Sequence, residues 1–187
     1  MNRDLVFIQD CTGSQGSYIY SATKNIEQIC AHIFESGKLQ NKEDLHIGLV
    51  AFRDHPPQDR TYVTKNFGFS SDISKVQRDL ETLSASGGGD GPEAVTAAMA
   101  EALNMEWRPQ ATKMIVLIAD APPHGIGEYG DGAHQSPSSV SALIRSPGFD
   151  EGSPDGNDPL QLARIMASRG ITLVSVLLLF CMLSCDL

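Results

Sequence analysis

An apolar run near the start of the chain, followed at once by an acid and two hydroxyls, most constrains the fold. Residues 5–8 read LVFI, and residues 9–14 read QDCTGS. A continuous apolar run of this length predicts a strand that is covered on both faces, as in a parallel sheet. The Gly and Ser after it predict a turn into a helix. The sequence therefore places Asp10, Thr12 and Ser14 together at the carboxyl end of a buried strand.

These three side chains offer one carboxylate and two hydroxyl oxygens. Such oxygens suit a hard divalent cation, Mg²⁺ or else Mn²⁺ or Ca²⁺, which keeps water or a partner's oxygen on its remaining positions. The alternative interpretation of the same run is a hydroxyl-rich turn that caps the following helix.

Apolar strands alternate with amphipathic helices along the chain. We expect strands at 46–52, at 61–69 on a sheet edge beside the preceding strand, at 113–119, and from 171 onward. Helices are expected from the turn at 13–14 to near 37, over 73–83, from Pro92 onward, and from 158–159 to 170. This order predicts a doubly wound α/β domain, with a mostly parallel sheet and helices on both faces. Functional side chains then belong at the carboxyl ends of the strands, where the strand order reverses.

A second acid, Asp120, ends the apolar strand at 113–119. It is a candidate for the same site as Asp10, although the two lie far apart in sequence. The glycine-rich stretch 87–91, GGGDG, opens onto the same rim of the sheet. We therefore expect Asp90 and Glu93 to join the site.

In order along the chain, three segments, DCTGS at 10–14, GGGD at 87–90 and IAD at 118–120, resemble the metal-ion-dependent adhesion site of von Willebrand factor A domains. The resemblance covers nearly the whole chain and implies one A-type domain over residues 1–187. It implies Asp10, Thr12, Ser14 and Asp120 as metal-site residues.

The second loop departs from most of that family, which has a Thr where Asp90 stands. The segment DGPE at 90–93 is instead similar to integrin β subunits, where the Glu is a metal ligand and the Asp serves a neighbouring cation. That similarity implies Glu93 as a ligand and Asp90 as a residue of an adjacent cation or of the surroundings of the first.

A further resemblance is to the A-type domains attached to atypical alpha kinases of amoebae and fungi. It depends on FRDHPPQD at 52–59 and APPH at 121–124, and it implies an intracellular setting. We expect Arg53, His55 and His124 to line a partner-facing rim outside the metal ligands. The alternatives are a solvated turn for 53–59 and structural roles for the histidines.

The charge of the chain bears on its partners. A net charge of -9 argues against a nucleic-acid surface, because nothing would neutralise phosphates. A cation held by only one or two carboxylates keeps positive character and attracts an acidic group of a protein partner. Because Thr12 and Ser14 have no adjacent base in sequence, we expect a binding module and no enzyme.

Two alternatives remain open. DCTGS also resembles the phosphorylation motif of haloacid-dehalogenase-like phosphotransferases, with Asp10 as nucleophile and residues 155–158 as the magnesium segment. Against it, Cys11 replaces the motif's Lys, and Asp155 follows a loop and no apolar strand. The other alternative is a metal-free scaffold domain.

The remaining segments carry weaker expectations. Residues 125–158 are rich in Gly, Ser and Pro and predict an irregular insertion. No cleavable signal is seen, so a cytoplasmic protein with reduced cysteines is expected. The apolar tail at 177–187 is too short to span a bilayer. The resemblance implies a missing final strand and helix, so we expect the tail to cover an open sheet edge or to self-associate.

Overall fold

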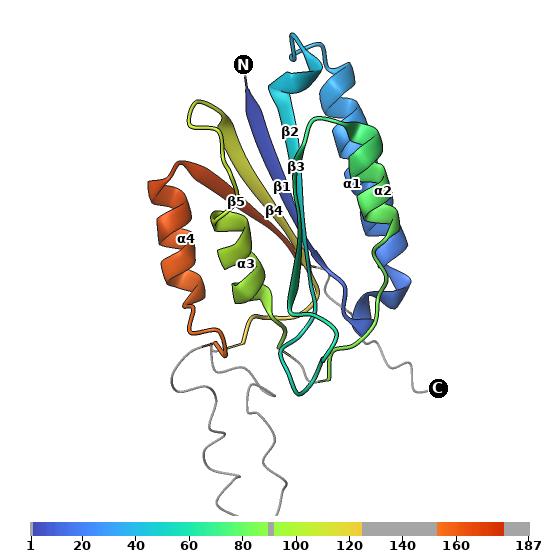
Figure 1. The fold of residues 1–187 in the computed structure, drawn as a ribbon, viewed down its shortest axis with the longest axis vertical. Coiled ribbons are helices and arrows are strands. Elements are labelled where there is room, and N and C mark those ends of the chain that lie inside the picture. The colour runs from blue at the N-terminus through green and yellow to red at the C-terminus, as the bar shows by residue number, and fades with distance from the viewer. Residues whose placement is uncertain (1, 90–91, 125–152, 178–187) are drawn as a thin grey trace, which may run out of the picture.

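A five-stranded sheet forms the centre of the protein, for which the computed structural model describes residues 2–89, 92–124 and 153–177. The strand order is β3-β2-β1-β4-β5 (Figure 1). The bounds are β1 Arg3–Asp10, β2 Leu45–Phe52, β3 Thr64–Ser70, β4 Thr112–Ala119 and β5 Ile171–Leu177. All neighbouring strands run parallel except β3, which pairs antiparallel with β2 at one edge. The predicted edge hairpin is therefore confirmed, with β3 beginning three residues later than expected.

Helices cover both faces of this sheet (Figure 1). The helices α1 (Ile19–Glu35) and α2 (Ile73–Glu81) lie on one face, and α3 (Val95–Leu103) and α4 (Pro159–Ser168) lie on the other. Two short 3₁₀ helices, η1 (Gly13–Ser17) and η2 (Lys42–Asp44), precede α1 and β2. This arrangement confirms the predicted doubly wound α/β fold.

Strand β1 is buried on both faces, as its continuous apolar run predicts. Val6 and Ile8 pack into the core beneath α3 and α4, whereas Leu5 and Phe7 pack into the core beneath α1 and α2. Fully burying a side chain of this kind contributes roughly 1.5–3 kcal/mol. The strand is thus fixed in register by two cores at once, and its carboxyl end is a rigid place for a site.

The predicted helix signals are met at two helices. Asp72 caps α2 by accepting a hydrogen bond from the Ser74 amide at 2.9 Å, and Asp158 caps α4 by accepting one from the Leu160 amide at 2.8 Å. The prediction for Pro92 was wrong, because α3 begins only at Val95. The intervening Glu93 instead forms a parallel bridge with Pro123 after β4, so the chain is still extended there.

Several expectations fall outside the described residues, namely the insertion from 125 to 152, Asp90, and the tail from 178 to 187. No helix within the described ranges is long and apolar enough to cross a bilayer. Cys11 and Cys30 are buried free thiols.

Candidate metal site

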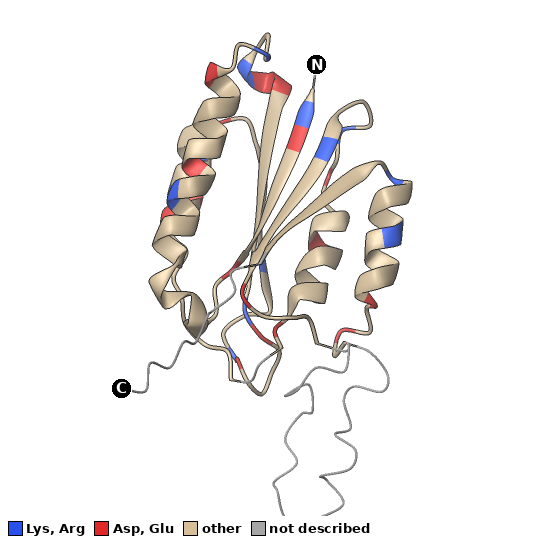
Figure 2. Cartoon of the chain, turned by 180° about the vertical axis from the view of Figure 1, so that it is seen from behind, with Lys and Arg blue, Asp and Glu red and all other residues tan. Residues whose placement is uncertain are grey.

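Backbone hydrogen bonds join the loops at the carboxyl ends of the strands. The Cys11 amide donates to the Phe52 carbonyl at 2.9 Å, which ties the end of β1 to the end of β2. The Gly13 amide donates to the Gly87 carbonyl at 2.9 Å, and the Ser86 amide donates to the Cys11 carbonyl at 3.0 Å. The glycine-rich loop is thereby held against the turn after β1. Figure 2 shows acidic positions gathered below these strand ends.

Four of the predicted site residues lie in one row of close polar contacts on this rim. Asp10 Oδ1 accepts from the Thr12 amide at 2.8 Å and from Thr12 Oγ1 at 2.7 Å. Thr12 Oγ1 lies 3.0 Å from Ser14 Oγ, which donates to Asp120 Oδ1 at 3.1 Å. Because β1 and β4 are adjacent parallel strands, their terminal acids meet at the point where the strand order reverses.

Asp10 is the most constrained of these residues. Its side chain is buried, and its Oδ2 accepts no hydrogen bond from any residue that the structure describes. Burial raises the pKa of Asp10 to about 6, hydrogen bonds from Thr12 oppose the rise, and the neighbouring carboxylate of Asp120 adds to it. A buried carboxylate oxygen with no donor, beside a second carboxylate, favours a cation as the missing partner.

Glu93 approaches the site from the second loop. It is 4 % exposed, and its backbone amide donates to the Pro122 carbonyl at 3.0 Å. A Cβ added at Gly88, whose φ is +76°, would lie 3.0 Å from Glu93 Oε1 and 3.4 Å from Thr12 Cβ. Glu93 and Thr12 therefore flank Gly88, and the positive φ of this position favours a glycine between them.

The donor set suits magnesium better than zinc. No three His, Cys, Asp or Glu side chains converge on a common point within the described part of the chain. The rim instead combines the carboxylates of Asp10 and Asp120 with the hydroxyls of Thr12 and Ser14. Such an oxygen set fits a hard cation.

The structure corrects the predicted partner rim at two of its three residues. Arg53 is 7 % exposed, and its guanidinium donates to Thr61 Oγ1 at 2.8 Å and to the Ser84 carbonyl at 3.0 Å. His124 is 1 % exposed and pairs with Asp54 at 2.9 Å. Both side chains brace loops from within, because buried polar groups need partners inside the protein. His55 alone of the three keeps a half-buried position.

Two acids that the sequence did not single out support the same loops. Asp54 is fully buried and accepts from the His55 amide at 2.6 Å as well as from His124. Asp59 accepts from the Thr61 amide at 2.7 Å, and its carboxylate occupies the place where a Cβ of Gly87 would stand. Nothing in the local pattern distinguishes these acids from those of a solvated turn.

The segment that the phosphotransferase alternative needs lies elsewhere on the rim. Asp155 accepts hydrogen bonds from Thr96 Oγ1 at 3.3 Å and from the Asn157 amide at 3.1 Å. Its charge acts on His55, where it raises a pKa that burial lowers. No contact among the described residues joins Asp155 to Asp10, so this alternative gains no support.

Comparisons with known proteins agree with this geometry. The family model of the von Willebrand factor A domain matches residues 4–135. The chain is 36% identical over 135 residues to the alpha-protein kinase vwkA of Dictyostelium discoideum, covering 72% of this chain and 20% of that protein. It is 28% identical over 174 residues to a putative ariadne-like RING finger protein, R811, of Acanthamoeba polyphaga mimivirus, covering 93% and 16%. The chain thus spans about a fifth or less of the length of these relatives.

Solved structures show the same fold at low sequence identity. The pilus adhesin SpaC of Lactobacillus rhamnosus GG in its open conformation aligns with a TM-score of 0.61 at 16% identity, over 93% of this chain and 23% of that one. The von Willebrand factor domain of the type V pilus tip protein Mfa5 of Porphyromonas gingivalis aligns with a TM-score of 0.50 at 16% identity, over 73% and 45%. Together with the matched residues 4–135, these likenesses show that the chain belongs to the von Willebrand factor A domain family, a family of protein-interaction modules, and is similar to the alpha-kinase-associated type.

Proposed function

We propose that this domain binds a protein partner through a divalent cation on the rim formed by the ends of β1 and β4. The observation that carries the proposal is Asp10 Oδ2, a buried carboxylate oxygen with no hydrogen-bond donor among the described residues. Leaving such a group without a partner costs several kcal/mol, so a fold that retains it gains from a bound cation.

Asp10, Thr12, Ser14, Glu93 and Asp120 would hold the cation, either directly or through water. When bound, a divalent cation offers an open position to a carboxylate oxygen. The Thr12 hydroxyl donates a hydrogen bond to Asp10, and the Ser14 hydroxyl donates a hydrogen bond to Asp120. The oxygen lone pairs of both hydroxyls are therefore directed away from the carboxylates. If only one of the three carboxylates binds the cation directly and the others act through water, the cation keeps positive character, which selects an acidic group on the partner.

The setting of the domain is also part of the proposal. One relative is an alpha-protein kinase, and kinases need the ATP found inside cells. We therefore propose an intracellular role in which the domain brings a partner to a larger protein. No chemical step is assigned to the domain itself.

Calorimetry with Mg²⁺, Mn²⁺ and Ca²⁺ on the purified chain tests the site before any partner is known. We expect one binding event per chain with at least one of these cations. Added acetate, as a minimal carboxylate, should alter the measured heat by occupying the open position. A chain that binds none of the three cations contradicts the proposal and leaves the metal-free scaffold. Turnover of a chromogenic phosphate ester with Mg²⁺ would support the phosphotransferase instead.

A further inference from the structure

Half of one face of the sheet is not covered by a helix among the described residues. On the side of α1 and α2, β4 and β5 present Val116 beside Val174 and Ile118 beside Val176. Val174 and Val176 are 39% and 43% exposed. On the opposite side, Ile171 of β5 is 5% exposed and lies beneath α4. One face of β5 is therefore buried by a helix, whereas the other face is exposed.

An apolar groove of about 410 Å³ runs between α1 and this bare strip. It has no Lys, Arg, Asp or Glu in its lining, and β5 has none at all, as Figure 2 shows. Its apolar and aromatic lining includes Tyr18, Ala22, Ile29, Val116, Ile118 and Val176. Contiguous exposed apolar surface of this kind marks a docking site.

The chain that follows β5 starts beside this groove. Strand β5 ends at Leu177, directly after Val176 in the groove lining. The next ten residues read LLFCMLSCDL, with Asp186 as their single charged residue. Each large apolar side chain among them gains roughly 1.5–3 kcal/mol when it leaves water. Burial of the apolar side chains of the segment against the apolar groove would therefore remove both surfaces from water.

The segment is long enough to fill the groove. From Tyr18 to His32, the groove follows α1 for a distance of roughly 21 Å at the helical rise per residue. Ten residues span at most roughly 33 Å when extended. Residues 178–187 can therefore reach from the end of β5 along the length of the groove.

We propose that residues 178–187 dock into the groove between α1 and the β4–β5 strip of their own chain. The tether favours this occupant over a second copy, because a short linker sets an effective concentration in the millimolar range. A second copy at micromolar concentration competes poorly with that. Docking would cover the exposed side chains of Val174 and Val176 on this face of β5.

Two cysteines in the segment make the proposal measurable. Cys181 and Cys185 are in the docking segment, whereas Cys11 and Cys30 are buried, which raises the pKa of each of these two thiols to about 12. Thiol labelling under native conditions therefore reports on the segment. In the full chain, we expect Cys181 to label slowly, and Ile29→Asp and Val176→Asp each to speed its labelling at least roughly tenfold. Both positions are exposed, so neither change disturbs the core.

Leu160→Asp is the matched control, because Leu160 is 66% exposed on α4 at the opposite face. It should leave the labelling rate of Cys181 unchanged. Fast labelling of Cys181 in the parent chain overturns the proposal. So does a rate that rises on dilution while sedimentation shows a dimer dissociating, since the occupant is then a second copy. Protection that is independent of concentration in a monomer supports it.

Discussion

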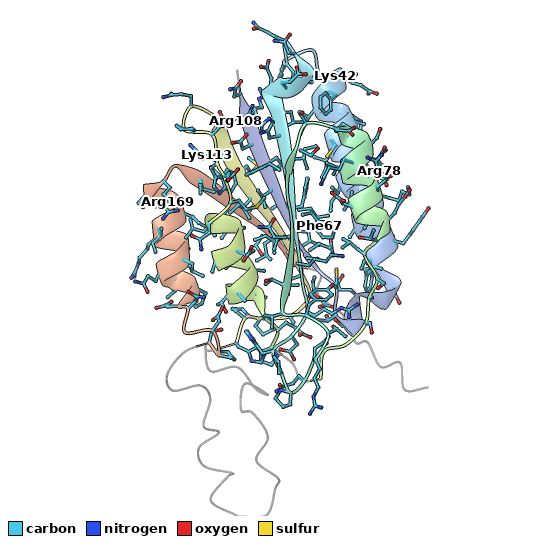
Figure 3. The ribbon with its side chains drawn as sticks, in the orientation of Figure 1. Lys42, Phe67, Arg78, Arg108, Lys113 and Arg169 are labelled. Atoms are coloured by element: carbon cyan, nitrogen blue, oxygen red, sulfur yellow. The ribbon has the colours of Figure 1, made fainter. Side chains whose placement is uncertain are left out.

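Strand β1 carries a buried aspartate near each end, and the two are treated very differently by the fold. Asp4 accepts two hydrogen bonds of 2.8 Å from Arg108, one from its amide and one from its Nε. Figure 3 shows Arg108 beside the amino ends of the strands. Asp10, at the other end, accepts only from the amide and hydroxyl of Thr12 and has Asp120 as a neighbour.

The difference separates a structural acid from a candidate ligand. The guanidinium of Arg108 balances the charge of Asp4, so this carboxylate needs no partner from outside the chain. The charge of Asp10 has no such counterpart among the described residues that contact it, although the residue is just as deeply buried. An uncompensated charge persists in a folded core where function requires it.

The largest effect should come from Asp10→Ala, which removes the buried carboxylate. We expect no measurable binding of Mg²⁺ by calorimetry, whereas the metal-free variant keeps its thermal unfolding midpoint or gains a few degrees. The reason is that the lost carboxylate contributes to binding of the cation and not to the stability of the core. A variant that binds Mg²⁺ like the parent would show that the rim is not the metal site.

Asp4→Ala should have the opposite profile. It leaves the partly buried guanidinium of Arg108 without its carboxylate, which lowers the free energy of unfolding by roughly 3 kcal/mol. Urea unfolding measures this loss. In the fraction that remains folded, the affinity for Mg²⁺ should equal that of the parent. A loss of affinity at constant stability would undo the distinction between the two ends of β1.

The pH dependence of stability sharpens the comparison further. The pKa of Asp10 is raised from 3.8 to about 6, so the folded protein holds this proton more tightly than the unfolded chain. Stability from this group is therefore present below about pH 4 and is lost as pH rises to about 6, by up to about 3 kcal/mol. Unfolding with chelator at pH 4 and pH 7 should show that loss in the parent and not in Asp10→Asn. Equal slopes would mean that Asp10 is not desolvated.

Of the two ends of β1, the sequence predicted the role of the carboxyl end, where Asp10 lies. The unbroken apolar run at 5–8 predicted a strand buried on both faces, and the periodicity of 3.6 placed helices between strands. Parallel strands with short connections then bring Asp10 and Asp120 to one rim, whatever the details of the loops. The topology of the sheet was therefore enough to predict that Asp10 and Asp120 share one site.

The partners of Arg53, His124 and Asp4 were not predictable in the same way. Each binds a residue far away in sequence, such as Asp54 for His124 and Arg108 for Asp4. Periodicity reports which face of an element is buried, but it carries no information on which distant polar group will meet another. The loop at 53–59, with two prolines and three charged residues, therefore looked like solvent-facing chain, although Arg53 is buried.

Glu93→Gln tests how the second loop contributes. The change keeps the size of the side chain beside Gly88 and removes its charge. If Glu93 binds the cation directly, the affinity for Mg²⁺ should fall roughly tenfold, equivalent to about 1.4 kcal/mol. Calorimetry against the parent measures it. An unchanged affinity would assign the second-loop role to Asp90 or to water.

The smallest of these effects is expected for Asp120→Ala. Asp120 is only partly buried, and it accepts a hydrogen bond from the exposed Ser14, so it can act through water as readily as by direct contact. Removing it lowers the negative charge of the site, but it also relieves the repulsion that helps to raise the pKa of Asp10. These two consequences oppose each other, so the affinity for Mg²⁺ should fall only about threefold, less than for Glu93→Gln. Ser14→Ala serves as a comparison, because it removes a proposed ligand hydroxyl and keeps both carboxylates. A loss for Asp120→Ala as complete as that for Asp10→Ala would mean that the two acids bind the cation as an equal pair, and the contrast with Asp4 would then extend to β4.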